Sequence, residues 1–139
     1  PCVVLTKGVL PASLVGLSKA NIYGITLVSL DEGFRERMEP GAVPIADRLA
    51  ALRALHDAGY KTWVSMEPYP TPNVWDQELQ PILDAVSFVD SIVFGRVHYD
   101  KRTSSYKDLN AFYHDAAERV RGFCAENSIG CHIKTGTAD

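Results

Sequence analysis

The chain has 139 residues, of which 46% are hydrophobic and 22% are charged, and its formal net charge is -3. This balance predicts one soluble globular domain over residues 1–139, and it excludes a strongly basic protein while leaving a local basic groove for nucleic acid open. No apolar run is long enough to cross a membrane, so we expect no membrane partner.

The cysteines Cys2, Cys124 and Cys131 fit no metal-binding pattern. Their number is odd, their spacing contains no C-x-x-C pair, and no local histidine cluster completes a zinc site. We therefore expect no metal ligand in this chain. Each cysteine is interpreted as a small core residue of a reduced, cytoplasmic protein.

Strand patterns and helix patterns alternate along the sequence. Short apolar, β-branched runs that end in polar residues predict strands. The predicted strands occupy residues 2–8, 22–32, 61–73, 89–100 and 129–136, and the third runs into a loop stiffened by prolines.

Amphipathic patterns predict helices between these strands. They cover residues 11–20, 44–60, 74–86 and the apolar stripe from residue 109 to residue 123. The clearest helix is the second, where Ile45, Leu49, Leu52 and Leu55 recur at helical spacing and Gly59 stands at the expected C-terminal cap.

Two segments are predicted to be loops. Residues 34–44 are punctuated by proline and glycine, and residues 101–110 are polar. Glu39 and Arg48 flank the end of the first loop, and an ion pair or a helix-start contact explains both without a functional role.

Alternating strands and helices predict an α/β fold of parallel strands joined by right-handed crossovers. Two architectures fit: an open doubly wound sheet and part of a (β/α) barrel. The sequence contains neither G-x-G-x-x-G nor G-x-x-x-x-G-K-[ST], the usual nucleotide-binding signatures of the open sheet. About four or five units are too few to close an eight-stranded barrel, so we predict a portion of a TIM-like barrel.

Polar residues or glycine stand at the carboxyl end of each main strand, where both architectures place their active sites. They are Thr6 and Lys7, then Ser29, Asp31 and Glu32, then Ser65, Glu67 and Tyr69, and finally Gly95, Arg96, His98 and Tyr99. A purely structural sheet does not need this arrangement, although exposed loops are polar as well. The strand ends are therefore the predicted site.

Several of these residues also have a structural interpretation. Lys7 can attract a carboxylate or phosphate, or it can be a solvated loop lysine. The hydroxyl of Ser29 can hydrogen-bond within its own sheet. Glu67 can act as an acid or base, or it can form a salt bridge. His98 can be structural as readily as catalytic.

Four stretches resemble the later barrel strands of radical S-adenosylmethionine proteins, most closely the branch of spore photoproduct lyase and DNA-repair-photolyase-like proteins. They are "VVLTKG", "YGITLVSLDE", "RMEPGAVPIADRLAALRALHDAGYKTWVSMEPYP" and "IVFGRVHYD". The resemblance implies a partial, six-stranded (β/α)6 barrel. It also implies a [4Fe–4S] iron–sulfur cluster on a C-x-x-x-C-x-x-C loop and a 5′-deoxyadenosyl radical made from S-adenosylmethionine. This sequence lacks the cluster motif, so we expect it to be the C-terminal half of a longer protein, inactive alone.

The resemblance also assigns roles to single residues. Lys7 and Ser29 would hold the methionyl carboxylate of S-adenosylmethionine. Ser65, Glu67 and Gly95 would border its adenosine, with Glu67 near a ribose hydroxyl. The side facing the substrate would carry Arg96, His98 and Tyr99.

The expected function is hydrogen-atom abstraction by a lyase-like or DNA-repair-like enzyme, with damaged DNA as a candidate substrate. Its partners would be the N-terminal half of the protein, an electron donor and a nucleic acid. Two alternatives stay open. One is a non-catalytic α/β domain that binds a protein through its open sheet edge. The other is a half-barrel enzyme that uses Glu67 without any cluster.

Overall fold

Five parallel strands form the sheet of the computed structural model, which describes residues 1–139. In chain order they are β1 (Val3–Thr6), β2 (Ile22–Thr26), β3 (Lys61–Tyr69), β4 (Ser91–Arg96) and β5 (Gly130–Ile133). Each strand pairs in parallel with the next strand along the chain. The predicted α/β fold with a parallel sheet is therefore confirmed.

Helices occupy the segments between the strands. They are η1 (Ala12–Gly16), α1 (Glu32–Met38), α2 (Ile45–Asp57), α3 (Gln80–Ala85), α4 (Lys101–Ser104) and α5 (Leu109–Glu126). The helices predicted over residues 44–60 and 109–123 are present, and η1 is shorter than the predicted first helix. None of the helices is both long enough and apolar enough to span a membrane.

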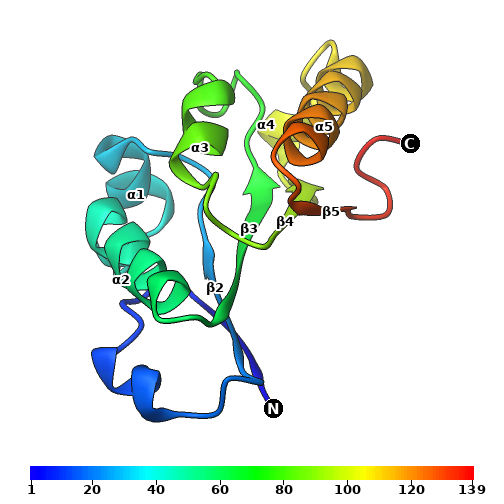
Figure 1. The fold of residues 1–139 in the computed structure, drawn as a ribbon. Helices are drawn as coiled ribbons and strands as arrows, with labels where there is room; N and C mark the ends of the chain where they lie inside the picture. The colour runs from blue at the N-terminus through cyan, green and yellow to red at the C-terminus, as the bar shows by residue number, and fades with distance from the viewer.

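The strand order β1-β2-β3-β4-β5 contains no reversal. Right-handed crossovers in an unreversed order place the connecting helices on one face of the sheet. Figure 1 shows α1, α2, α3 and α5 along that face. An unreversed order with helices on one face fits both a portion of a barrel and one half of a doubly wound sheet. We call the face without helices the bare face; on β3 it carries Trp63, Ser65 and Glu67.

The loop predicted at residues 34–44 is wrong over its first half, which forms α1. The Asp31 carboxylate caps this helix by accepting a hydrogen bond from the Gly33 amide at 2.7 Å. The Glu32 carboxylate accepts another from the Ile45 amide at 2.7 Å, so it also holds the start of α2. Pro40 and Gly41 come just after α1. They end the helix, and their presence did not mean that the whole segment is a loop.

Two further boundaries differ from the prediction. Strand β2 ends at Thr26, although the apolar run continues to Leu30. Leu27, Val28 and Ser29 after it stay buried outside the strand, whereas Leu30 is exposed, so the apolar run does not mark the length of the strand. In the polar segment at residues 101–110, the Asp100 carboxylate accepts hydrogen bonds from the amides of Arg102 and Thr103 and starts the one-turn helix α4.

The core lies between the sheet and the helices. From α2, Ile45, Leu52 and Leu55 are buried as predicted, whereas Leu49 is only partly covered. Arg48 lies on the same buried side of α2 as these leucines and Ile45, and its side chain is fully buried. Helix α5 contributes Tyr113, Ala116, Ala117, Val120 and Cys124.

Candidate functional site

The ammonium group of Lys7 stands just beyond the carboxyl end of β1. Its Nζ lies 2.9 Å from Oε2 of Glu39, and the Lys7 side chain is 44% exposed whereas that of Glu39 is 5% exposed. The other oxygen of Glu39 lies 3.4 Å from Nη1 of Arg48. The two cations share one carboxylate, so a net positive charge remains at this strand end.

Arg48 fixes this charge cluster from inside the protein. Its Nη1 donates to the Thr26 carbonyl at 2.7 Å, and its Nη2 donates to the Val43 carbonyl at 3.1 Å. The guanidinium therefore ties α2 to the end of β2 and to the loop before the helix. The sequence interpretation anticipated an ion pair of Glu39 with Arg48 but gave it no place in the site.

A cleft of about 290 Å³ opens at the carboxyl ends of the strands. Its polar lining includes Lys7, Glu39, His98 and Asp100, and its apolar wall includes Phe34 and Pro68. Segments that follow β1, β2, β3 and β4 all reach this cleft. The structure thus brings together Lys7, His98 and Tyr99, which the sequence placed at separate strand ends.

The loop after β4 holds Tyr99 at the cleft in a left-handed backbone conformation. Its φ is +64°, which is strained for a tyrosine, and its side chain is fully exposed. The following residue, Asp100, is fixed by the Arg102 guanidinium and by the backbone amides of α4, and these contacts lower the pKa of its carboxyl group. Beneath the loop, the hydroxyls of Thr103 and Thr71 hydrogen-bond at 3.2 Å.

Ser65, Glu67 and Gly95 lie on the bare face rather than in the cleft lining. The Glu67 carboxylate lies 2.9 Å from Nζ of Lys134, which follows β5. The Glu67 side chain lies across Gly95. A Cβ at position 95 would come within 2.8 Å of the Cδ of Glu67, so only glycine leaves room for this arrangement. Ser65 is buried beside it. The sequence interpretation missed Lys134, although this lysine also stands at a strand end.

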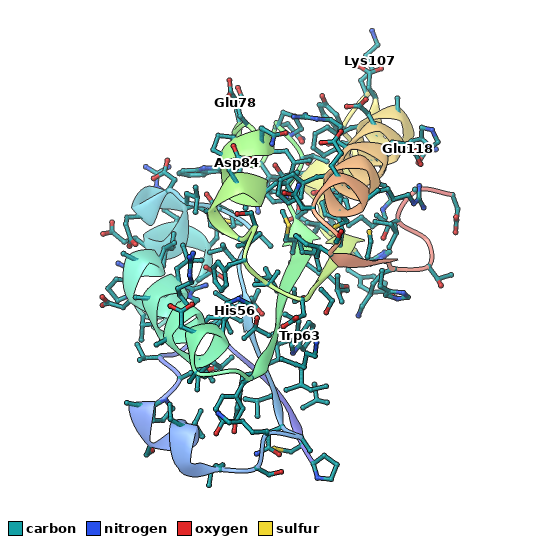
Figure 2. The ribbon with its side chains drawn as sticks, in the orientation of Figure 1. His56, Trp63, Glu78, Asp84, Lys107 and Glu118 are labelled. Carbon is teal, nitrogen blue, oxygen red and sulfur yellow. The ribbon has the colours of Figure 1, made fainter.

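Trp63 covers the bare face nearer to the amino ends of the strands. Its indole lies over Gly24, where any Cβ would overlap the ring, and its Nε1 donates to the Val4 carbonyl at 3.2 Å. Figure 2 shows Trp63 and His56 on opposite sides of the β3 ribbon. The tryptophan therefore packs on the sheet surface and leaves the polar strand ends free.

Arg96 does not join His98 and Tyr99 at the cleft. Its guanidinium lies 5.1 Å from the ring of Tyr113 on α5, and its Nη1 donates to the Gly136 carbonyl at 3.4 Å. Successive side chains of a strand point to opposite faces, so Arg96 points away from the bare face that its neighbour Gly95 lines.

Ser29 is also separate from Lys7. It is buried, its hydroxyl accepts a hydrogen bond from the Asp31 amide at 3.1 Å, and it lines another hollow beside Trp75 and Gln77. The cause is the early end of β2, which leaves Ser29 at the start of α1 rather than at a strand end.

The residues of this chain do not fit a [4Fe–4S] cluster. Cys2 precedes β1, whereas Cys124 lies on α5 and Cys131 in β5. No group of three or more histidine, cysteine or acidic side chains gathers closely enough to hold a metal ion. Any cluster ligands would have to come from outside residues 1–139.

Comparisons of the chain with protein-family models, with curated proteins and with solved structures found no match.

Proposed function

We propose that this chain is the C-terminal part of a (β/α)6 barrel enzyme of the radical S-adenosylmethionine class, and that its strand ends form part of the cofactor site. The observation that carries the proposal is the unreversed order of five parallel strands, with the helices on one face and a bare face on the other. A barrel portion has this arrangement, because inward side chains line its interior and the helices surround it.

The contacts of Lys7 suit the carboxylate of the cofactor. Its ammonium is exposed to the cleft, and the buried pair of Glu39 and Arg48 fixes its position. A carboxylate that approaches would meet a net positive charge and form a charge-assisted hydrogen bond. The apolar wall formed by Phe34 and Pro68 offers contact area to the rest of the ligand.

On the bare face, Ser65 and Glu67 would meet the adenosine hydroxyls. The Glu67 carboxylate is a hydrogen-bond acceptor for a ribose hydroxyl, and the Ser65 hydroxyl can both donate and accept. Gly95 gives the Glu67 side chain room to lie flat, which fixes the carboxylate beside Lys134. When bound, S-adenosylmethionine would supply the 5′-deoxyadenosyl group for hydrogen-atom abstraction, and an iron–sulfur cluster held outside residues 1–139 would supply the electron.

Calorimetric binding of two ligands tests the cofactor site. We expect the chain to bind S-adenosylmethionine, and Lys7→Met to raise its dissociation constant by about tenfold or more, because one charge-assisted hydrogen bond is lost. Binding of 5′-methylthioadenosine, which lacks the amino-acid carboxylate, should not change. Lys107→Met removes the lysine labelled beside α5 in Figure 2 and serves as the control. Absence of binding, or equal weakening of both ligands by Lys7→Met, would contradict the proposal.

The coding sequence that precedes the Pro1 codon tests the cluster part of the proposal. An in-frame C-x-x-x-C-x-x-C after a predicted strand would support a radical enzyme. A start codon directly before Pro1 would overturn this part, since the chain itself holds no fitting cysteine group.

A non-catalytic domain that binds through its sheet edge is a second candidate, favoured by the exposure of β1. Val3 is 67% exposed and Leu5 is 47% exposed on this edge strand. An edge of this kind pairs readily with another chain. In sedimentation velocity we expect concentration-dependent association that Leu5→Lys reduces. A monomer at all concentrations would count against this candidate.

A further inference from the structure

Two cysteines meet where α5 turns into β5. Cys124 lies in the last turns of the helix and is 1% exposed, whereas Cys131 in β5 is exposed. The amide of Ile129 donates to the Cys124 carbonyl at 2.9 Å, which fixes the turn between them. Figure 1 shows that the end of α5 and the short strand β5 lie side by side.

The register of the sheet points Cys131 toward the helix. Cys131 is the partner of Ile92 in β4, and Ile92 is fully buried on the helix-covered face. Side chains at paired positions of neighbouring strands project from the same face, so the Cys131 thiol lies on the side where α5 packs. Burial raises the pKa of the Cys124 thiol to about 12, and the neighbouring Cys131 thiol adds to the rise, as expected for two adjacent thiols.

We propose that Cys124 and Cys131 form a reversible disulfide that links α5 to β5 when the protein meets an oxidised low-molecular-weight disulfide such as glutathione disulfide. The inference does not rest on the proposed cofactor site. It assigns a modification site to a pair of residues that the site does not use.

The exchange proceeds in two steps. The exposed Cys131 thiol loses its proton, and its sulfur attacks one sulfur of glutathione disulfide, giving a mixed disulfide and one glutathione thiolate. The Cys124 thiol then loses its proton and attacks the Cys131 sulfur, which releases the second glutathione. The protein dithiol loses two electrons and two protons, and glutathione disulfide is reduced to two glutathione molecules.

The order of the steps follows from exposure and acidity. A bulky external disulfide reaches Cys131 but not the buried Cys124, so the mixed disulfide forms at Cys131. Only the thiolate is the nucleophile, and a pKa of about 12 keeps the Cys124 thiolate scarce at neutral pH. Ring closure should therefore be the slower step and should accelerate as the pH rises.

Peptide mapping of the oxidised protein tests the proposal. The folded chain is incubated in glutathione redox buffers, quenched with acid, alkylated and digested with trypsin, which cuts after Arg121 and Lys134. One peptide then contains both Cys124 and Cys131. We expect it to become lighter by two hydrogen atoms and to lose both alkylation sites. Cys2 lies in the separate peptide that ends at Lys7 and reports direct glutathionylation as an internal control.

Two serine variants separate the steps. In Cys124→Ser, the reaction should stop at a stable glutathione adduct on Cys131. In Cys131→Ser, the same peptide should stay free of both adduct and disulfide, because Cys124 is inaccessible. Cys2 should react equally in all three proteins. If, once the redox buffer has come to equilibrium, the wild-type peptide still keeps both thiols or still carries the glutathione adduct in place of the disulfide, the proposal is wrong.

A urea-unfolded sample shows whether the fold causes the pairing, because two cysteines this close in sequence also meet in an unfolded chain. We expect the equilibrium constant for ring closure to be at least about tenfold higher in the folded protein, since the fold raises the effective concentration of one thiol at the other. An equal or lower constant in the folded protein would overturn the proposal.

Discussion

At the scale of single residues, the buried guanidinium of Arg48 determines how the strand-end charges are arranged. It satisfies the carbonyl of Thr26 and faces the carboxylate of Glu39, which in turn faces Lys7. A buried charge of this kind is held by its partners, and removal of one partner leaves the others without compensation.

We expect Arg48→Met to lower the free energy of unfolding by about 3–5 kcal/mol, because the Glu39 carboxylate and the Thr26 carbonyl would stay buried without it. Arg53→Met is the control on the same helix, since Arg53 pairs with Asp57 at the surface at 3.5 Å. That exposed pair should contribute less than about 1 kcal/mol. Urea unfolding measures both values. Equal losses in the two variants would contradict the role assigned to Arg48.

Single residues were predictable where their position alone carried the signal. Lys7, His98 and Tyr99 line one cleft, as expected because strand ends meet at one edge of a parallel sheet. Arg48 was missed as a structural centre, although a charged residue between Ile45 and Leu52 on an apolar stripe was a visible signal. The separation of Ser29 from Lys7 was not predictable, because it depends on where β2 ends.

At the scale of elements, two aspartates that precede helices differ in their contacts. The Asp100 carboxylate accepts hydrogen bonds from two amides of α4, whereas the side chain of Asp108 makes no capping hydrogen bond at α5. A capping side chain satisfies amides that have no partner within the helix. Substitution of Asp108 is therefore a suitable control for substitution of Asp100.

We expect Asp100→Ala to lower the free energy of unfolding by about 1 kcal/mol, within the usual range for loss of an N-cap. Asp108→Ala should change it by much less, because no capping hydrogen bond is removed. Thermal unfolding of both variants measures the difference. A larger loss in Asp108→Ala would show that the cap at Asp100 is not what stabilises this loop.

Elements with a strong periodic pattern were predicted well, and those defined by capping were not. Helix α2 appears where the sequence placed it, whereas strand β5 covers only the middle of its predicted range, which has no strong periodic pattern. Helix α1 was missed because Asp31 and Glu32 make their capping contacts with Gly33 and the distant Ile45, and apolar spacing does not record such contacts. The end of β2 was missed for a related reason, because buried residues look alike inside and outside a strand.

At the scale of the whole molecule, stability should fall in alkaline solution. Burial raises the pKa of Tyr69 to about 12, with a hydrogen bond to Gln77 opposing the rise, and burial also raises the pKa of Tyr113. In the unfolded chain a tyrosine titrates near pH 10. Above that pH the unfolded state loses protons that the folded state retains, so the stabilisation present below about pH 10 disappears as the pH rises through about 12.

We expect the free energy of unfolding to decrease between about pH 10 and about pH 12, by roughly 2–3 kcal/mol for Tyr69 alone. Urea unfolding over this range in wild type and in Tyr69→Phe measures the effect, and the variant should show a shallower decrease. Tyr99→Phe removes a fully exposed hydroxyl and is the matched control. An unchanged slope in Tyr69→Phe would exclude this tyrosine as the cause.

The parallel α/β sheet followed from alternating patterns alone, whereas the helix-free face did not. Apolar β-branched runs predicted buried strands in a portion of a barrel, but they did not indicate which face the helices would cover. The strand order that leaves one face bare depends on contacts between strands, which hydrophobic spacing does not encode.

The unreversed strand order also has a consequence for how the chain acquires its shape during synthesis. Each strand from β2 onward pairs with the strand that left the ribosome just before it, so β1 waits only for β2 and every later strand finds a partner already made. The sheet contacts span short stretches of chain for a parallel fold, which keeps the loop-closure entropy of each addition modest. Assembly can therefore proceed one strand–helix unit at a time, in the direction of translation.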